Sequence, residues 1–556
     1  MSLEDLVLAL LKRWELLIVA AYWLYWLYGK IKAAITDAGG ESVQALPEVS
    51  QAANAQEQPR RPAPPPRPAA PPPRKAAPDA VQRLIDAAAA FEQQARALSD
   101  EVEREPANRR FVGVLREWIP ARCAEIREAL QRVQGPMDLS LIRAMNALEL
   151  VLAEIKDLVS QRRNPELRGQ LGDADRLADA CYQPVITFAR AEGLPLATAY
   201  PATQLAPLDL AIWTGFAPTQ IAPIFLPPGF FESLIFWPAL AHEVGHDFFI
   251  SVRGLDQSLR RELSLDTEEN GTRALYLRPD GSGLDAAELR RIFGGWLEEI
   301  FADVFGTLMC GPAYVKTMSM VFGAREDARE VLAVGRDPGT GRYDVHPPGH
   351  VRVHVGRVVL ERAGLHEDAG RLWNGWMTRH GFSPDEPPPL LFPMQDRYLA
   401  IRFQPMAEIA TELVERLYSG PLEGLNGFGL SDISGLDYGP SEHFEARRAR
   451  DAFLGGQVPA VRDARRVIAG AVLACVEKPE LEEQIRARAR EAIPALGTYE
   501  QAPDAYRPSA PVPAAPLTSA GPLEVAPGDV LEALLLREVL RRPARQLRRG
   551  RPGGRP

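Results

Sequence analysis

Histidine and cysteine are scarce in this chain, and an excess of positive charge is absent. The 556 residues include only 8 histidines and 4 cysteines. The cysteines form no CxxC pair, which favours free, mostly buried thiols in a reducing compartment over a disulfide framework. The formal net charge is −9. The composition therefore offers no bulk electrostatic basis for binding nucleic acid, and no nucleic-acid partner is expected.

A long hydrophobic run is also missing. The longest uninterrupted apolar stretch near the N-terminus runs from Leu16 to Tyr28, whereas a membrane-spanning helix needs about 20 residues. Trp14 and the tyrosines and tryptophans up to Tyr28 suit a membrane interface, so residues 14–28 predict membrane association. Basic residues follow, which would leave the domains after this segment in the cytoplasm. The alternatives are an amphipathic oligomerisation helix and a soluble cytoplasmic protein.

Length and patterning indicate several regions. Hydrophobic residues make up 46% and charged residues 25% of the chain, as is ordinary for a globular protein. We predict a mainly α fold with a small β element, in which helical regions flank a central domain. The expected regions are an apolar segment (1–32), a Pro-rich linker (33–78), a helical bundle (79–200), the central domain (201–395), a C-terminal helical region (396–500), and a Pro/Ala-rich linker with a basic tail (501–556).

The most informative stretch is the HEVGH sequence at 242–246. His242 and His246 are four residues apart, so on a helix both imidazoles leave the same face. Two imidazoles at this spacing can hold one Zn²⁺, with Glu243 beside them as a general base. The flanking residues are apolar, which indicates that these polar side chains are buried and need partners.

A second acidic segment follows in Trp296–Gly306, within a helix expected at 285–310. Glu299 and Asp303 are again four residues apart on one face of an otherwise apolar stretch. Burying two carboxylates is costly unless they meet a metal ion or hydrogen-bond donors. Glu298 is adjacent, but only Glu299 has an aspartate four residues on, so Glu299 is the preferred metal ligand and Glu298 the alternative.

A third segment, Asp344–Val353, carries a cluster of histidines and an arginine. It reads DVHPPGHVRV and contains His346, His350 and Arg352. His354 follows closely, which places three of the chain's few histidines in one short region. Scattered core histidines would not gather in this way.

Together the three segments resemble the gluzincin zinc peptidases, whose pattern is HExxH followed by ExxxD on another helix. The third segment resembles the HPPxxxR stretch of the membrane heat-shock and CAAX-prenyl peptidases. The resemblance covers about residues 220–360. It implies a zincin-like core in which the HExxH helix packs on the ExxxD helix, with His242, His246 and Glu299 as zinc ligands. It also implies that Asp303 orients a ligand histidine and that Arg352 steadies the region of Glu299.

The function predicted from this resemblance is a zinc-dependent endopeptidase acting on a protein or peptide substrate. Glu243 would serve as general base on a metal-activated water, and His346, with Tyr343 or His350 as further candidates, would stabilise the oxyanion. The segment Ile221–Leu226 predicts an edge strand that pairs with substrate through Ile221, Ile224 and Phe225. A loop is the alternative for this segment. The alternative function is a catalytically inactive, membrane-tethered helical scaffold that retains a zincin core.

Overall fold

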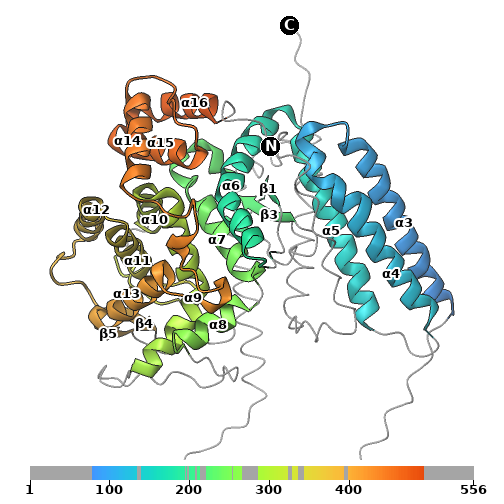
Figure 1. Ribbon diagram of the computed structural model, residues 1–556, viewed down its shortest axis with the longest axis horizontal. Coiled ribbons are helices and arrows are strands. Elements are labelled where there is room, and N and C mark those ends of the chain that lie inside the picture. The colour runs from blue at the N-terminus through green and yellow to red at the C-terminus, as the bar shows by residue number, and fades with distance from the viewer. Residues whose placement is uncertain are drawn as a thin grey trace, which may run out of the picture. The chain divides into compact units, whose positions relative to one another are not determined.

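The structure is a computed structural model of the whole chain. It describes residues 78–133, 139–194, 196, 200–206, 210–212, 221–252, 254–265, 286–323, 328–335, 343–393 and 398–493. The chain divides into two units, residues 1–73 with 336–343, and residues 74–335 with 344–556. Only Tyr343 of the first unit is described, so the architecture below is that of the second unit, which is mainly helical as predicted (Figure 1).

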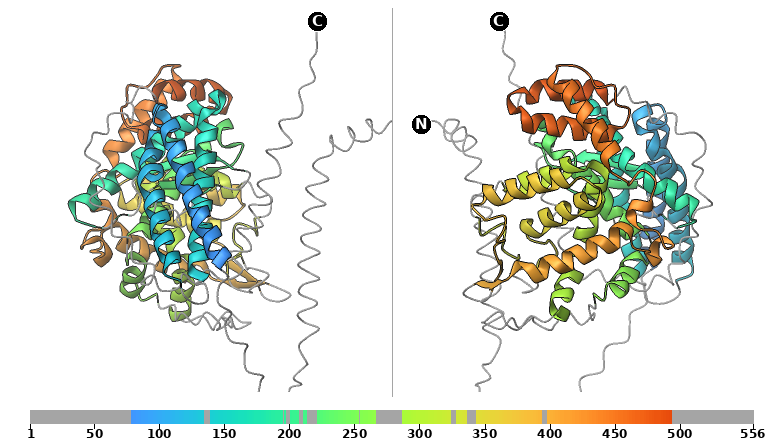
Figure 2. Two further views of the ribbon diagram at one scale, coloured as in Figure 1. Left: turned by 90° about the vertical axis from the view of Figure 1, so that its right-hand side faces the viewer. Right: turned by 60° about the vertical axis from the view of Figure 1, so that its left-hand side comes forward.

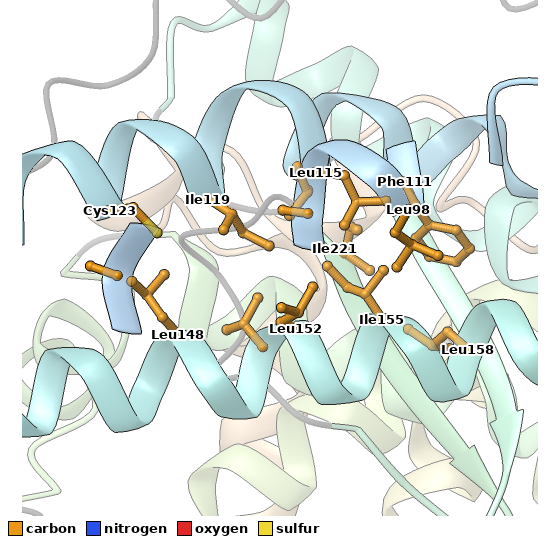
Figure 3. Close-up of a cluster of buried hydrophobic side chains, with 14 of the residues drawn as sticks. Leu98, Phe111, Leu115, Ile119, Cys123, Leu148, Leu152, Ile155, Leu158 and Ile221 are labelled. Carbon is orange, nitrogen blue, oxygen red and sulfur yellow. The ribbon is translucent and has the colours of Figure 1, made fainter. Parts of the chain in front are cut away.

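The first described helices form a bundle. They are α3 (Pro78–Val102), the short turns η1 (Pro106–Phe111) and η2 (Val114–Trp118), α4 (Ile119–Gln131) and α5 (Leu139–Arg163). Helices α3, α4 and α5 pack side by side, as the blue and cyan ribbons of Figure 2 show. Apolar side chains at helical spacing fill the space between them. Figure 3 shows part of this core: Leu98, Phe111, Leu115, Ile119, Cys123, Leu148, Leu152, Ile155, Leu158 and, from strand β3, Ile221.

A small sheet connects the bundle to the rest of the unit. After α6 (Pro165–Ala191), the chain forms β1 (Tyr200–Leu205), β2 (Ala211–Ile212) and β3 (Ile221–Leu226), in the order β1-β3-β2. Strand β3 is parallel to β1 along its whole length and antiparallel to β2 at Ile224 and Phe225. Helices α5 and α6 pack on β1, and α7 packs on β2 and β3. The bundle and the sheet therefore share one continuous core.

The predicted strand at 221–226 exists, but its predicted place at the edge of the sheet is wrong. Strand β3 is central, with β1 on one side and β2 on the other. Proline in a strand suggested an edge because it has no N–H to donate. The described ladder with β2 ends at Ile224, so Pro223 lies just beyond it. A central strand can therefore accommodate this proline.

The remaining elements form the larger helical part of the unit. The bounds are η4 (Phe230–Glu232), η5 (Leu234–Phe236), α7 (Ala239–Ser251), α8 (Leu255–Glu262), α9 (Ala286–Cys310), α10 (Pro312–Gly323), α11 (Gly349–Arg362), α12 (His366–Arg379), β4 (Leu390–Pro393), β5 (Tyr398–Ile401), α13 (Phe403–Ser419), η6 (Glu423–Leu425), η7 (Leu430–Asp432), α14 (Pro440–Leu454), α15 (Ala464–Glu477), η8 (Pro479–Leu481) and α16 (Glu482–Ala492). The orange and red helices α14, α15 and α16 lie together (Figure 2).

Two of the expected region boundaries fall inside packed structure. Strands β4 and β5 pair with each other across the boundary expected at residue 395. The boundary expected after residue 200 falls within β1, and helix α6, assigned to the bundle from sequence, packs on α7 and α15 as well as on α5. The apolar segment 1–32, the linker at 33–77 and the tail at 501–556 lie outside the described residues. Among the helices that are described, none combines the length and apolarity needed to cross a membrane.

Candidate metal centre

Helix α7 carries the HEVGH sequence in its middle. His242 and Glu243 are buried, and His246 is largely so. The helix begins after Pro238, and the apolar residues around the motif face the core. As the i, i+4 spacing predicts, the two imidazoles leave one face, with ring centroids 4.5 Å apart.

Helix α9 crosses α7 closely enough to bring its carboxylates to these histidines. The crossing depends on Gly245 inside HEVGH, because a Cβ at this position would lie 2.9 Å from the Cα of Ala302. A side chain there would push the helices apart. Helix α9 spans Ala286–Cys310, as the sequence predicted, and ends at Gly311, whose φ of 57° suits glycine.

Three side chains converge on one point. The Nε2 atoms of His242 and His246 are 3.0 Å apart. One carboxylate oxygen of Glu299 lies 3.4 Å from His242 Nε2, and the other lies 3.4 Å from His246 Nε2. Ligands bound at about 2.0–2.1 Å to a tetrahedral zinc ion stand roughly 3.3 Å apart. The His242, His246 and Glu299 group could therefore hold a metal ion.

The opposite nitrogens of both imidazoles face carboxylates. Asp303 Oδ1 lies 3.2 Å from His242 Nδ1, and Glu298 Oε1 lies 2.9 Å from His246 Nδ1. Each carboxylate accepts a hydrogen bond from Nδ1–H, which directs the Nε2 atoms at each other and at Glu299. The lone pairs of the two Nε2 atoms and of the Glu299 carboxylate repel one another at this distance unless a proton or a metal ion lies between them. Glu298, the alternative ligand from sequence, instead orients His246.

Arg352 of α11 holds the two acidic side chains of α9. Its guanidinium donates to both carboxylate oxygens of Asp303, at 2.8 and 2.7 Å, and its Nη1 lies 3.1 Å from Glu299 Oε2. The centroid of the Phe322 ring lies 5.0 Å from its charge. Contact with Glu299 is the position that the HPPxxxR resemblance implies. The guanidinium also lies 3.2 Å from His242 Nε2, so it belongs to the same charge cluster.

Tyr314 of α10 is a member of the cluster that sequence reasoning missed. Its hydroxyl donates to Asp303 Oδ1 at 2.5 Å and lies 3.1 Å from His242 Nδ1. Gly306 makes room for the ring, because a Cβ there would lie 2.6 Å from Tyr314 Cε2. The available signal was a tyrosine among apolar neighbours, Ala313 and Val315, whose buried hydroxyl needs a partner.

The charges in this cluster shift one another's protonation. Burial alone would lower the pKa of His242, but its hydrogen bonds with Asp303 and Glu299 raise it to about 9. Burial would raise the pKa of Glu299, whereas the hydrogen bond with His242 and the charge of Arg352 hold it below its usual range. Burial raises the pKa of Glu243, which makes this carboxylate a stronger base.

His346 reaches the cluster from its solvent side. Its side chain is 58% exposed, and its Nε2 lies 3.3 Å from Glu299 Oε1. Asp344 Oδ1 lies 2.7 Å from its Nδ1 and also accepts its backbone N–H. The sequence placed His346 at the site, and the structure brings it into contact with Glu299.

His350 does not reach the site, so its prediction as an oxyanion donor is wrong. It is the second residue of α11 and lies in an aromatic pocket, where its Nδ1 accepts a hydrogen bond from Trp376 Nε1 at 3.0 Å. Burial lowers its pKa to about 3. The neutral ring is part of the core because the α11 face that carries it turns away from α9. Tyr343 belongs to the first unit, and its place relative to the cluster is not described.

Two of the three β3 residues that were predicted to bind substrate lie in the core. Ile221 and Ile224 are fully buried, and Ile221 packs among the bundle side chains (Figure 3). Phe225 is half-buried. The side chains of Ile221 and Ile224 therefore cannot line a substrate groove, because both are enclosed in the core.

The outer edge of β1 is closed by side chains. Gln161 both donates to and accepts from the backbone of Leu205, and Arg162 donates to Thr203 O at 2.9 Å. Asp175 accepts the Thr203 N–H at 2.8 Å, and Arg110 donates to Pro201 O at 2.6 Å. An added strand would have to displace all of these bonds, so β2 is the remaining edge of the described sheet.

Comparisons with protein-family models, with curated proteins and with solved structures found no match to this chain.

Proposed function

We propose that the chain is a zinc-dependent endopeptidase, with His242, His246 and Glu299 as the metal ligands. The observation that carries the proposal is the convergence of the two Nε2 atoms and the Glu299 carboxylate, with spacings of 3.0 and 3.4 Å. Glu299 Oε2 is buried, and it faces Arg352 Nη1 at 3.1 Å and His242 Nε2 at 3.4 Å. Such an oxygen suits a metal ligand.

A zinc ion held there would act as a Lewis acid and lower the pKa of a water molecule towards about 7. The protein's own groups supply the rest. Asp303 and Glu298 keep both imidazoles in the tautomer whose Nε2 lone pair faces the centre. Arg352 balances the charges of Asp303 and Glu299, which would otherwise lie buried together.

Glu243 is the general base in this proposal. It follows His242 on the same helix, and no hydrogen bond to another described residue occupies its carboxylate. Its raised pKa suits a group that takes a proton from the attacking water and returns it to the leaving amine. His346 stands at the solvent side of Glu299 and would donate to the developing oxyanion.

The test is peptide cleavage measured beside zinc content. Glu243→Gln should keep the fold and the zinc but lose cleavage of an unfolded protein substrate, because the amide is nearly isosteric and cannot act as a base. The matched control is Glu445→Gln, the same change at an exposed position of α14 outside the cluster, which should cleave like wild type. Cleavage by Glu243→Gln at the wild-type rate, or zinc-loaded wild type without any cleavage, would refute the proposal.

A further inference from the structure

A second candidate site lies between α10, which also carries Tyr314 of the metal cluster, and three other helices. It is a pocket of about 340 Å³ lined by residues of α10, α12, α14 and α15. Small-ligand pockets usually enclose about 300–1,000 Å³, so the size is at the lower end of that range. Because α10 presents Lys316 to the pocket and Tyr314 to the metal cluster, the two sites lie on different faces of one helix.

The charges that line the pocket are unbalanced. Its basic residues are Lys316, Arg371, Arg379, Arg447 and Arg450, whereas its acidic residues are Asp368 and Glu477. Arg371 and His443 pair with Asp368, and Arg450 lies 3.8 Å from Glu477. Both acidic groups of the pocket are therefore already paired with cations. The pocket keeps an excess of positive charge although the net charge of the whole chain is −9.

Three cations remain without an anion. Within the part of the chain that the structure describes, Lys316, Arg379 and Arg447 form no ion pair. Lys316 is half-buried, and both its burial and the nearby charge of Arg379 lower its pKa. A partly buried charge next to a like charge is unfavourable unless an anion accompanies it. This arrangement gives the pocket an anion-binding character.

The helices around the pocket also present apolar side chains to it. Leu372, Trp376, Leu473 and Val476 line it. A ligand that fills the pocket therefore needs an apolar body as well as an anionic group. Guanidinium groups match phosphate oxygens in geometry and charge.

We propose that this pocket binds a small organic phosphate, with the phosphate on Lys316, Arg379 and Arg447 and the apolar body against Trp376 and Leu473. The proposal rests on this cavity and its charges, and it does not depend on the proposed peptidase activity.

The test uses isothermal titration calorimetry of the full chain with phenyl phosphate, at fixed ionic strength. Phenyl phosphate should bind with one site per chain and at least tenfold more tightly than inorganic phosphate, which lacks the apolar body, or phenol, which lacks the anionic group. Arg447→Gln should weaken binding at least fivefold. Arg448→Gln is the matched control, because it removes the same charge from the next, exposed position of α14 outside the pocket.

Two glycine-to-leucine variants distinguish binding inside the pocket from binding to a basic surface. Gly375 lines the pocket, and a Cβ there would meet nothing within 4 Å. Gly375→Leu should abolish binding without removing a charge. Gly370→Leu, on the same helix and also without neighbours within 4 Å, should bind like wild type.

Two results would overturn the proposal. One is the absence of saturable phenyl phosphate binding to wild type. The other is equal binding by wild type, Arg447→Gln and Gly375→Leu, which would place the ligand elsewhere, including at the metal centre. Lys316→Met offers an independent check on folding, because removing this charge should raise the melting temperature of the ligand-free protein and weaken binding together.

Discussion

Replacing Arg352 by methionine should expose the charge balance of the metal centre. Methionine keeps an apolar stem of similar length over Phe322 but removes the guanidinium that contacts Asp303 and Glu299. Asp303 is 1% exposed and Glu299 is 6% exposed, so neither carboxylate can turn to water. Breaking a buried ion pair by removing one partner costs about 3–5 kcal/mol. We expect the metal-free variant to lose free energy of unfolding in this range.

Zinc should restore much of this loss. A cation bound by His242, His246 and Glu299 supplies positive charge where the guanidinium was lost. A ligand present at 1,000 times its dissociation constant stabilises the folded state by about 4 kcal/mol. The assay is urea unfolding of wild type and Arg352→Met, each with chelator and with excess zinc. The difference between the two proteins should shrink when zinc is present.

The matched control is Arg357→Met on the same helix. Arg357 pairs with Glu361, 2.7 Å away, and both side chains are about one third exposed, so the pair is worth about 0–1 kcal/mol. It should therefore lose little stability and show no dependence on zinc. An Arg352→Met variant as stable as wild type in chelator, or one that gains no more from zinc than wild type does, would refute the electrostatic account.

Three further predictions concern the helix crossing, the bundle and the N-terminus. Gly245→Ala should destabilise the protein by about 1–3 kcal/mol and weaken zinc binding, because the added methyl group meets α9. Gly295→Ala is the control and should do neither, because the space around Gly295 is open. Equal unfolding midpoints for the two variants would contradict this prediction. Burial, followed by the charge of Asp157, raises the pKa of Glu154 from 4.5 to about 8, so its stabilising effect is complete below pH 4.5 and is lost as the pH rises towards 8. Glu154→Gln should therefore gain on the order of 3 kcal/mol over wild type at pH 7, and a gap that does not grow between pH 5 and pH 8 in urea unfolding would count against the buried carboxyl. Deleting residues 1–32 should move the protein from the membrane fraction to the soluble fraction without removing zinc, and a full-length protein already found in the soluble fraction would show that residues 14–28 are no anchor.

The sequence predicted the parts of the centre that depend on local helical geometry. The i, i+4 spacing places His242 with His246, and Glu299 with Asp303, wherever these segments are helical. The bounds of α9 followed from its apolar pattern and from the Gly-Pro pair at 311–312.

The sequence did not predict features that depend on packing between distant segments. Tyr314 and Glu298 acquire their roles because α10 and α9 happen to present them to the imidazoles of α7. His350 shares a segment with Arg352 but faces the aromatic core, and only the packing of α11 decides which side chain faces α9. The central place of β3 depends on β1, which pairs with it from a position well before it in the chain.

The number of zinc ions bound per chain tests the central claim most directly. Elemental analysis of the purified protein, with X-ray absorption at the zinc edge, should find about one zinc per chain and nitrogen or oxygen ligands at about 2.0–2.1 Å. His242→Ala and Glu299→Ala should each lose the metal while remaining folded by circular dichroism. Wild type that contains no zinc after loading, and whose unfolding is the same with zinc and with chelator, would contradict the account.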